Sequence, residues 1–578
     1  MTAAARRIAL AITVAATMVL VLPAVGAAHK ERGHRHHHRG TARLSEIKHI
    51  VVVYEENHSF DNLFGGWEGV RGRKAADAAH TRQVSQSGLP FDCLKQDDVN
   101  LTSPPLSATC TATTTGTAFS SHFANHPFRI DTPALIPPDA TTCPKPGDAA
   151  PNGVAKGAGD PGGCTRDLVH RYYQEQYQLD GGKQDRYTAG SDAVGLTQGS
   201  YRTRKLPIYK YLHAKGHPSY SISDNFFQAA FGGSFLNHQW LIAAHTPVFE
   251  GAPNDGSAND LHSVVDANGM PTNYPLYASP AAAAVKDQSL VASCSPAPGR
   301  GPTPAGVACG DEAVNTIQSS YQPFSPGTAD TKKLPPQTTP TIGDRLSAKG
   351  VDWAWYSGGW SNAAGNLDAP GWSNGSGPKC SDPAANAAAT FPNCPDKLFQ
   401  FHHQPFNYYA SFAPGTQARR QHLRDEAEFI ANAKRSNKRC ELKPVSFVKP
   451  LGNENEHPGY ASEHTGSDHL VDLLKGIEGS RCAKDTAVVV TYDEFGGAWD
   501  HVPPPGQGGT PGPHDKWGPG TRVPAFTVSP GGGHRFSVDR TQHDTTSILA
   551  TIEHRFGLRP LSRRDSSVED LSKAIAGR

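Results

Sequence analysis

The sequence predicts an α/β fold in which a mostly parallel sheet is flanked by helices. Residues 47–54 and 486–492 are continuous apolar, β-branched runs, which are typical of strands buried on both faces. Around these runs, strand patterns alternate with helical patterns, and such alternation favours an α/β sheet. The 578 residues, of which 37% are hydrophobic and 19% charged, could form one large globular domain or two ordinary ones.

The expected elements follow one another along most of the chain. Besides the two buried runs, strands are expected at residues 351–356, 444–448 and 523–528, and helices at 234–244, 467–477 and 544–556. Three stretches between them are rich in Pro, Gly, Ala and Ser and lack apolar periodicity. We interpret these stretches as surface insertions within one domain of residues 46–578, at about residues 85–165, 250–340 and 360–395.

The N-terminus has the features of an export signal, which we assign to residues 1–28. Arg6 and Arg7 precede an apolar run that ends in small residues near Ala27 and Ala28. The paired arginines allow export by the twin-arginine route, and an uncleaved membrane anchor is the alternative. Residues 29–45 follow as a flexible, His-rich linker that could catch metal ions. We therefore expect a protein that is secreted or stays in the cell envelope.

The ten cysteines all follow the expected signal, and an even number in an exported chain indicates disulfides. Eight of them lie in the three insertions, so we expect the disulfides to staple these loops. Joining sequence neighbours closes only short loops and gives the pairs Cys93–Cys110, Cys143–Cys164, Cys294–Cys309, Cys380–Cys394 and Cys440–Cys482.

The overall charge excludes some partners. The 55 basic residues nearly cancel the 54 acidic ones, so nothing in the net charge favours binding to nucleic acid or a general attraction to anionic membranes. Recognition of a phosphate group would have to be local.

Acidic and amide side chains follow the two buried runs. Glu56 and Asn57 come after the first run, and Asp493 and Glu494 come after the second. In an α/β sheet, ligands collect beyond the carboxyl ends of the strands. Oxygen ligands on rigid strand ends suit a divalent cation, although acidic residues at such positions are often only solvated or capping groups.

Ser234 follows two glycines at the expected start of a helix. There its hydroxyl and the free backbone N–H groups could meet an anion, but the same pattern is typical of an ordinary serine N-cap. Five histidines in other distinctive segments could neutralise phosphate oxygens or protonate a leaving group. Any one of the 27 histidines could equally be a packing residue. The five are His170, His402, His403, His457 and His501.

The stretch Glu-Glu-Asn-His-Ser-Phe-Asp-Asn-Leu-Phe-Gly at residues 55–65 resembles the opening motif of the bacterial phosphoesterase family of phospholipases C and acid phosphatases. That family belongs to the alkaline-phosphatase-like superfamily, so the resemblance implies an alkaline-phosphatase-like sheet. Several motifs in the same order are more specific than any one of them. The likeness continues through residues 167–187, 232–238, 402–408, 456–458, 491–505 and 544–558.

The resemblance also implies roles for single residues. Ser234 is the implied nucleophile, and it would share one divalent metal ion, whether Ca, Mg, Mn, Zn or Fe, with Glu56, Asn57, Asp493 and Glu494. His170, His403 and His457 are the implied phosphate-facing catalytic histidines, and His402, Asn237 and His501 are the implied substrate-binding residues. In this sequence His238 stands where the family usually has an arginine, and Thr545 stands where it has a histidine.

The function expected from these features is hydrolysis of a phosphate ester. The first expectation is phospholipase C-like cleavage of a phosphodiester, plausibly a phospholipid, through a phosphoserine intermediate and with transient membrane contact. A broad-specificity acid phosphatase is the alternative, and a non-catalytic secreted protein that binds metal or a cell surface is a distant one. The sequence leaves the oligomeric state open.

Overall fold

The structure is a computed structural model that describes residues 44–96, 106–132, 167–280, 285–295, 301–325, 327–372 and 399–576. The expected export signal and nearly all of the His-rich linker lie outside the described residues. Two of the expected disulfides, Cys143–Cys164 and Cys380–Cys394, also lie outside them. Within the described residues no helix is both long and apolar enough to cross a membrane.

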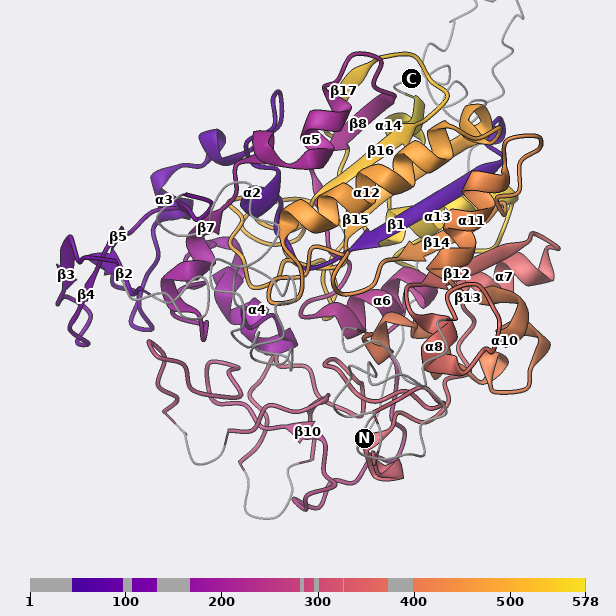
Figure 1. Cartoon of the computed structure of the whole chain (residues 1–578). Coiled ribbons are helices and arrows are strands. Elements are labelled where there is room, and N and C mark those ends of the chain that lie inside the picture. Colours follow the sequence, from indigo (N-terminus) through magenta and orange to yellow (C-terminus); the bar gives the residue numbers. More distant parts are fainter. Residues whose placement is uncertain are drawn as a thin grey trace, which may run out of the picture.

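An eight-stranded sheet forms the centre of the molecule (Figure 1). Five of its seven strand pairs are parallel, and only β16 runs antiparallel to its two neighbours. This arrangement confirms the expected mostly parallel sheet. In sheet order the strands are β13 (Leu423–Asp425), β12 (Trp353–Ser357), β14 (Val445–Lys449), β1 (His49–Glu55), β15 (Thr486–Tyr492), β16 (Ala525–Ser529), β8 (Ser219–Ser223) and β17 (Phe536–Asp539).

The sequence explains why β1 and β15 lie at the centre of the sheet. Their Ile and Val side chains are almost completely buried, as expected for strands covered on both faces. The two strands pair in parallel over seven residues each. The outer strands β8, β13 and β17 were not predicted, because Ser-Tyr-Ser-Ile-Ser, Leu-Arg-Asp and Phe-Ser-Val-Asp lack an apolar run.

Helices pack on the sheet in two groups. The first group, α5, α11 and α12, makes mutual contacts, and Figure 1 shows α12 and α11 in front of the strands. The second group, α6, α7 and α13, also makes mutual contacts, and α7 packs on β12. The helices are α2 (Phe60–Leu63), α3 (Ala78–Thr81), α4 (Tyr172–Leu179), α5 (Pro207–Leu212), α6 (Ser234–Ala243), α7 (Ile342–Ala348), α8 (Trp360–Ala364), α10 (Gln417–His422), α11 (Glu426–Arg435), α12 (Glu463–Glu478), α13 (Thr546–Phe556) and α14 (Ser572–Ala576).

The described parts of the insertions form small two-stranded pairs and short helices such as α8. The segment around β10 lies away from the sheet, at the bottom of Figure 1. The structure contains the expected disulfides Cys93–Cys110, Cys294–Cys309 and Cys440–Cys482, which are typical of exported proteins. The small pairs are β2 (Cys93–Leu94) with β5 (Phe123–Ala124), β3 (Cys110–Ala112) with β4 (Phe119–Ser121), β6 (Phe128–Arg129) with β7 (Gly199–Ser200), β9 (Phe226–Phe227) with β18 (His543–Asp544), and β10 (His262–Ser263) with β11 (Leu290–Ala292).

Candidate active site

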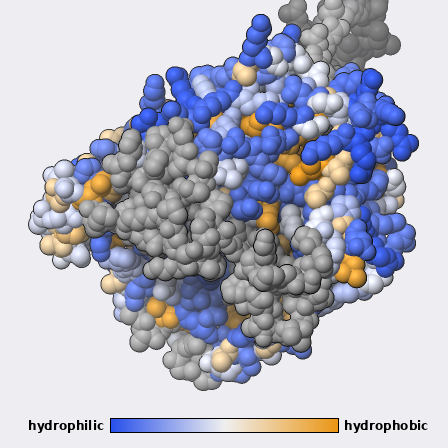
Figure 2. All heavy atoms as spheres, viewed as in Figure 1, coloured by the Kyte–Doolittle hydropathy of each residue, from blue (hydrophilic) through white to orange (hydrophobic). Residues whose placement is uncertain are grey.

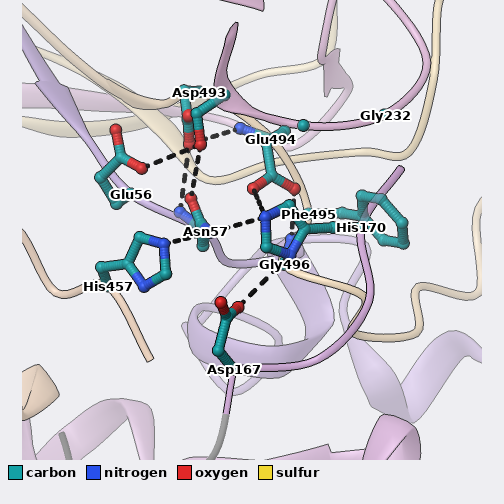
Figure 3. Close-up of polar contacts among 12 residues, drawn as sticks. Glu56, Asn57, Asp167, His170, Gly232, His457, Asp493, Glu494, Phe495 and Gly496 are labelled. Atoms are coloured by element: carbon teal, nitrogen blue, oxygen red, sulfur yellow. Dashed lines mark hydrogen bonds and ion pairs between the residues drawn. The ribbon is translucent and has the colours of Figure 1, made fainter. Parts of the chain in front are cut away.

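Two pairs of polar side chains lie where the central strands end. Glu56 and Asn57 follow β1, and Asp493 and Glu494 follow β15, with the two strands in parallel register up to their last residues. The backbone N–H of Asn57 donates to Asp493 Oδ1 at 3.1 Å and ties the two strand ends together. All four side chains are buried, and Figure 3 shows those of Glu56, Asn57 and Asp493 converging.

A close backbone approach holds the turn after β1. Asn57 has a φ of 56°, in the left-handed region that asparagine tolerates better than most residues. On the opposite loop, a Cβ at Gly496 would lie 2.3 Å from the carbonyl oxygen of Asn57. Only glycine therefore fits at residue 496, and this fit brings the loop that carries Asp493 against Asn57.

Ser234 is the first residue of α6, and its hydroxyl faces the acidic cluster. Its Oγ donates to Glu56 Oε2 at 3.1 Å and lies 3.5 Å from Asn57 Oδ1. The N-cap of α6 is Gly233, and no side chain caps the helix. Ser234 is therefore not an ordinary serine N-cap, because its hydroxyl interacts with the cluster and not with the helix backbone.

Two buried side chains fix the glycine turn before Ser234. The amide of Asn237 forms hydrogen bonds only with the backbone of residues 230–233. Glu175 accepts the N–H of Gly232 at 2.5 Å, and burial raises the pKa of its carboxyl to about 7. These contacts leave no amide group of Asn237 aimed at a ligand, so the structure places Asn237 as a support of the turn.

His170 and His457 approach the cluster from the other side (Figure 3). Nδ1 of His170 lies 2.6 Å from the carbonyl of Leu168, and Nδ1 of His457 lies 2.6 Å from the carbonyl of Pro458. A carbonyl only accepts, so each Nδ1 carries the proton and each Nε2 faces inward. The two Nε2 atoms lie 3.5 Å and 2.9 Å from Asn57 Nδ2.

Three further cationic or titratable side chains surround Glu56. Lys449, the last residue of β14, lies 2.7 Å from Glu56 Oε1, and both side chains are fully buried. His403 Nε2 lies 3.3 Å from the same oxygen. The ring of His238 stacks parallel on that of His403, with centroids 4.9 Å apart, and its Nδ1 faces the carbonyl of Ser234 at 2.8 Å.

Burial dominates the electrostatics of the cluster. It raises the pKa of Glu56 well above its usual value, the neighbouring Asp493 raises it further, and Lys449 opposes the shift. Burial likewise raises the pKa values of Asp493 and Glu494. Three carboxylates that repel one another share one buried lysine, so the cluster favours an additional cation.

The same burial disfavours charged histidines. It lowers the pKa of His402 to about 3 and those of His403 and His457 well below the usual value, with nearby positive groups adding to the effect. An anionic phosphate beside these rings would favour their protonated forms again.

A cavity of about 490 Å³ opens onto Ser234. Its walls include His170, His402 and His457, together with Asp167 and Tyr460. Ser234 thus has the acidic cluster on one side and an open, histidine-lined space on the other. This arrangement can hold an anionic group against a serine hydroxyl.

The Phosphoesterase family model matches residues 47–559. The chain belongs to the Phosphoesterase family. The match contains all the predicted site residues, from Glu56 to His501.

Known relatives of this phosphoesterase are named phospholipases C. Phospholipase C B of Mycobacterium tuberculosis is 34% identical over 156 residues, which cover 23% of this chain and 29% of that protein. Phospholipase C A of the same organism is 23% identical over 567 residues, covering 92% of this chain and 78% of that protein. Non-specific phospholipase C4 of Arabidopsis thaliana is 32% identical over 130 residues, covering 19% of this chain and 24% of that protein.

The strongest of these likenesses are partial. The chain spans less than a third of the length of phospholipase C B where the two match. Among solved structures, a 2-O GAG sulfatase aligns at a TM-score of 0.22 and 11% identity over 45% of this chain and 60% of that one. A score this low supports no argument about the fold.

The structure brings most of the predicted site residues of the phosphoesterase together, but not His501. The Nδ1–H of His501 donates to the carboxylate of Asp61, beside Asp500 and Arg522, and His501 lines a different cavity from Ser234. Glu494 Oε2 accepts the N–H of Gly496 at 2.6 Å, while its Oε1 lies 3.6 Å from His170 Nε2 and accepts no hydrogen bond among the described residues.

Two residues near Glu56 were missed as candidates. Lys449 could have been noticed as a charged residue that ends an otherwise apolar strand pattern. His238 was recorded only as a departure from the family, yet it lies 3.8 Å from Asp493 Oδ2 and 3.9 Å from Glu56 Oε1. No feature of the sequence indicated that Lys449 and His238 would both lie beside Glu56.

The residues present fit a divalent cation. Asp493 Oδ2 is buried and accepts no hydrogen bond among the described residues. It belongs to the same cluster as Glu56, Asn57 and the hydroxyl of Ser234, all of which offer oxygen ligands. Such a hard donor set suits magnesium, calcium or manganese, and the nearby histidines also admit zinc or iron.

Proposed function

We propose that this phosphoesterase is an exported, metal-dependent hydrolase with an alkaline-phosphatase-like sheet that cleaves phosphodiesters of the phospholipid type through a phosphoserine intermediate. The observation that carries the proposal is the position of the Ser234 hydroxyl. It lies within 3.1 Å of Glu56 and opens onto a cavity lined by histidines. A serine in a purely structural role at this point would instead cap α6.

A cation would be held by Glu56, Asn57, Asp493 and Ser234. When bound, it would lower the pKa of the serine hydroxyl and balance negative charge on the phosphate. Glu494 would act through His170, since its oxygen faces that ring and the backbone of Gly496.

The chain's own groups suggest the order of events. Ser234 Oγ attacks phosphorus and forms the new O–P bond, while its proton passes to Glu56 Oε2, to which it already donates. The bond from phosphorus to the leaving alkoxide breaks in line, and the alkoxide takes its proton from a protonated histidine of the cavity wall and leaves as an alcohol. Water then cleaves the phosphoserine bond and restores the hydroxyl.

The inward-facing histidines would stabilise the charge that develops on phosphate. His170 and His457 keep their Nδ1 protons on backbone carbonyls, so each Nε2 can donate to a phosphate oxygen once the anion favours the protonated ring. His402 and His403 extend this wall beside the cavity and Glu56 respectively. Preorganised groups of this kind act where charge develops and cost no rearrangement.

The named relatives support a phospholipid substrate, because those compared above are called phospholipases C. Contact with a membrane would be brief. On the face shown in Figure 2, the described surface is mostly hydrophilic with small scattered apolar areas. Export agrees with the three described disulfides.

The test is turnover of three chromogenic esters by wild type and Ser234→Ala, before and after chelation. The esters are a phosphomonoester, a bis-aryl phosphodiester and a phosphocholine ester. We expect diester and choline-ester turnover that disappears in the variant and in the chelated enzyme. A trapped phosphoserine after brief acid quench would identify the intermediate.

A matched control is Ser462→Ala. Ser462 is an ordinary N-cap whose side chain accepts from the N–H of Thr465, so this variant should lose some stability and keep full turnover. Turnover of the monoester alone would indicate an acid phosphatase. A Ser234→Ala enzyme as active as wild type would contradict the assigned nucleophile, and no turnover of any ester would favour a non-catalytic binding protein.

A further inference from the structure

A second cavity, of about 700 Å³, is strongly basic. It shares no lining residue with the cavity at Ser234. Its walls come from the loop after α2, from Arg129 and from residues 202–205. Six cationic side chains line it, against the single carboxylate of Glu68: Arg73, Lys74, Arg129, Arg202, Arg204 and Lys205.

The cations of this basic cavity outnumber the carboxylates around them. Within the part of the chain that the structure describes, none of the six forms an ion pair. The one carboxylate in the lining, Glu68, is already paired with His213 and accepts the hydroxyl of Tyr209 at 3.1 Å. The buried Asp131 accepts the backbone N–H of Arg202 at 2.8 Å, and its charge acts on Arg73, Arg129 and Arg202 without an ion pair among the described residues.

The framework of the basic cavity is rigid. Thr203 accepts the N–H of Gly66 at 3.1 Å and donates to the carbonyl of Leu63 at 2.8 Å, which clamps two walls together. Across the loop, a Cβ at Gly72 would lie 2.3 Å from the carbonyl oxygen of Gly65, so the loop is folded tightly on itself. The guanidinium of Arg73 donates to the carbonyl of Asp61.

One group in the basic cavity is held without a partner. Nε of Arg202 is buried and forms no hydrogen bond among the described residues. An unpaired buried donor costs free energy, and the cost rises when like charges surround it. A multiply charged anion would satisfy this donor and offset the mutual repulsion of the six cations. Arginines fit phosphate in particular, because the planar guanidinium donates two parallel hydrogen bonds.

We propose that the basic cavity binds a multiply charged phosphate anion at a site separate from the Ser234 cavity. In a chain with a net charge of only +1, this local concentration of cations supplies an electrostatic attraction that the net charge does not. The anion is either a free polyphosphate or the phosphorylated head group of a lipid. In the second case the cavity orients the enzyme on an anionic membrane.

The test measures binding and needs no turnover, so it stands whether or not the proposed phosphodiesterase activity is correct. Ser234→Ala protein is titrated with tripolyphosphate by calorimetry. The same protein is sedimented with phosphatidylcholine vesicles, with and without phosphatidylinositol 4-phosphate. We compare it with protein that also carries Lys74→Glu and Arg204→Glu, two exposed residues without ion pairs among the described residues.

We expect the double charge reversal to weaken binding at least about tenfold, and rising salt to weaken wild-type binding steeply. Lys434→Glu is the matched control, since it changes an exposed lysine on α11, which Figure 1 places on the other side of the molecule from α2. Binding of tripolyphosphate would assign the site to free anions, and binding only to the phosphoinositide vesicles would assign it to lipid head groups. Absence of both, or equal binding by the double variant, would overturn the proposal.

Discussion

Two of the buried clusters of carboxylates and histidines in the described part of the chain are completed in different ways. In the first, around Ser234, the carboxylates of Glu56 and Asp493 share one lysine, and burial raises their pKa values. In the second, Arg522 donates to both Asp61 and Asp500 from the centre of the cluster. The first cluster has one lysine beside its carboxylates, while in the second an arginine pairs directly with both carboxylates.

The contacts of Arg522 show how complete the second cluster is. Its Nε lies 3.1 Å from Asp500, and its other two nitrogens donate to Asp61 and to the carbonyls of Arg71 and Asp224. Burial alone would raise the pKa of Asp61, but the hydrogen bond from His501 and the charge of Arg522 lower it below the usual value. Residue types alone therefore do not distinguish a site of chemistry from a structural cluster. The hydrogen-bond and ion-pair partners of each polar atom do.

The largest effect should come from Asp493→Asn in the first cluster. We expect kcat/KM to fall by about a hundred- to a thousandfold, because the neutral amide no longer helps to hold a cation beside Ser234. Without added metal the variant should be at least as stable as wild type, since the change removes one of several repelling buried carboxylates.

The measurements are turnover of a diester and the Tm, each with chelator and with added divalent ion. Wild type should gain Tm on addition of the ion, because a ligand that binds only the folded state stabilises it. The Tm of Asp493→Asn should not rise when the ion is added. If Asp493→Asn kept more than a tenth of wild-type kcat/KM, the first cluster would not be the site of chemistry.

The next effect concerns stability and arises in the second cluster. Arg522→Met should cost about 3–5 kcal/mol in the free energy of unfolding, because it leaves the buried charges of Asp61 and Asp500 uncompensated. Chemical denaturation measures the loss. Arg439→Met, at an exposed ion pair with Glu441, should leave the free energy of unfolding almost unchanged. A large loss of turnover in folded Arg522→Met protein at low temperature would show that the second cluster also takes part in the chemistry.

The sequence predicted the centre of the fold better than its edges. β1 and β15 were predicted correctly because strands buried on both faces need a continuous apolar run, which leaves a clear pattern. The expected helix at residues 234–244 is α6. The edge strands β13 and β17 form because they pair with a neighbouring strand. Their short polar sequences contain no pattern that predicts this pairing.

The residues of the site likewise include some that the sequence could place and some that it could not. Glu56, Asn57 and Asp493 could be placed together from the sequence, because parallel strands deliver their carboxyl ends to one edge of a sheet. Ser234 was linked to them only through the family resemblance. The contacts of Lys449 and His238 depend on how β14 and α6 pack, and His501 is drawn into the second cluster by Asp61 from a distant segment.

A moderate effect should follow from Asn237→Ala. This change leaves the backbone polar groups of residues 230–233 without their side-chain partner, so the turn before Ser234 loosens. We expect kcat to fall about ten- to a hundredfold with little change in KM, because positioning is lost and the cavity wall is kept. Asn237→Asp keeps the acceptor and should retain more activity. A change confined to KM would instead favour the predicted substrate-binding role.

The smallest effect tests whether every unpartnered buried carboxylate marks a chemical site. Glu553 on α13 has a buried oxygen without a hydrogen-bond partner, and burial together with Asp565 raises its pKa to about 9. The charge of Arg345 opposes this rise in pKa without reversing it, so we expect the folded protein to keep Glu553 protonated without a bound cation.

Because the folded-state pKa lies above the unfolded one, the unfolded chain releases this proton first as the pH rises from about 4.5 towards 9. Stability contributed by the neutral carboxyl is therefore present in acid and is lost across that window. Glu553→Gln mimics the neutral form, so its Tm should equal that of wild type at pH 4 and exceed it by about 2 °C or more at pH 8.5, as calorimetry would show. If added divalent ions instead raised the Tm of wild type but not of Glu553→Gln, Glu553 would be a cation ligand. The contrast between a neutral carboxyl at Glu553 and cation-binding carboxylates beside Ser234 would then be wrong.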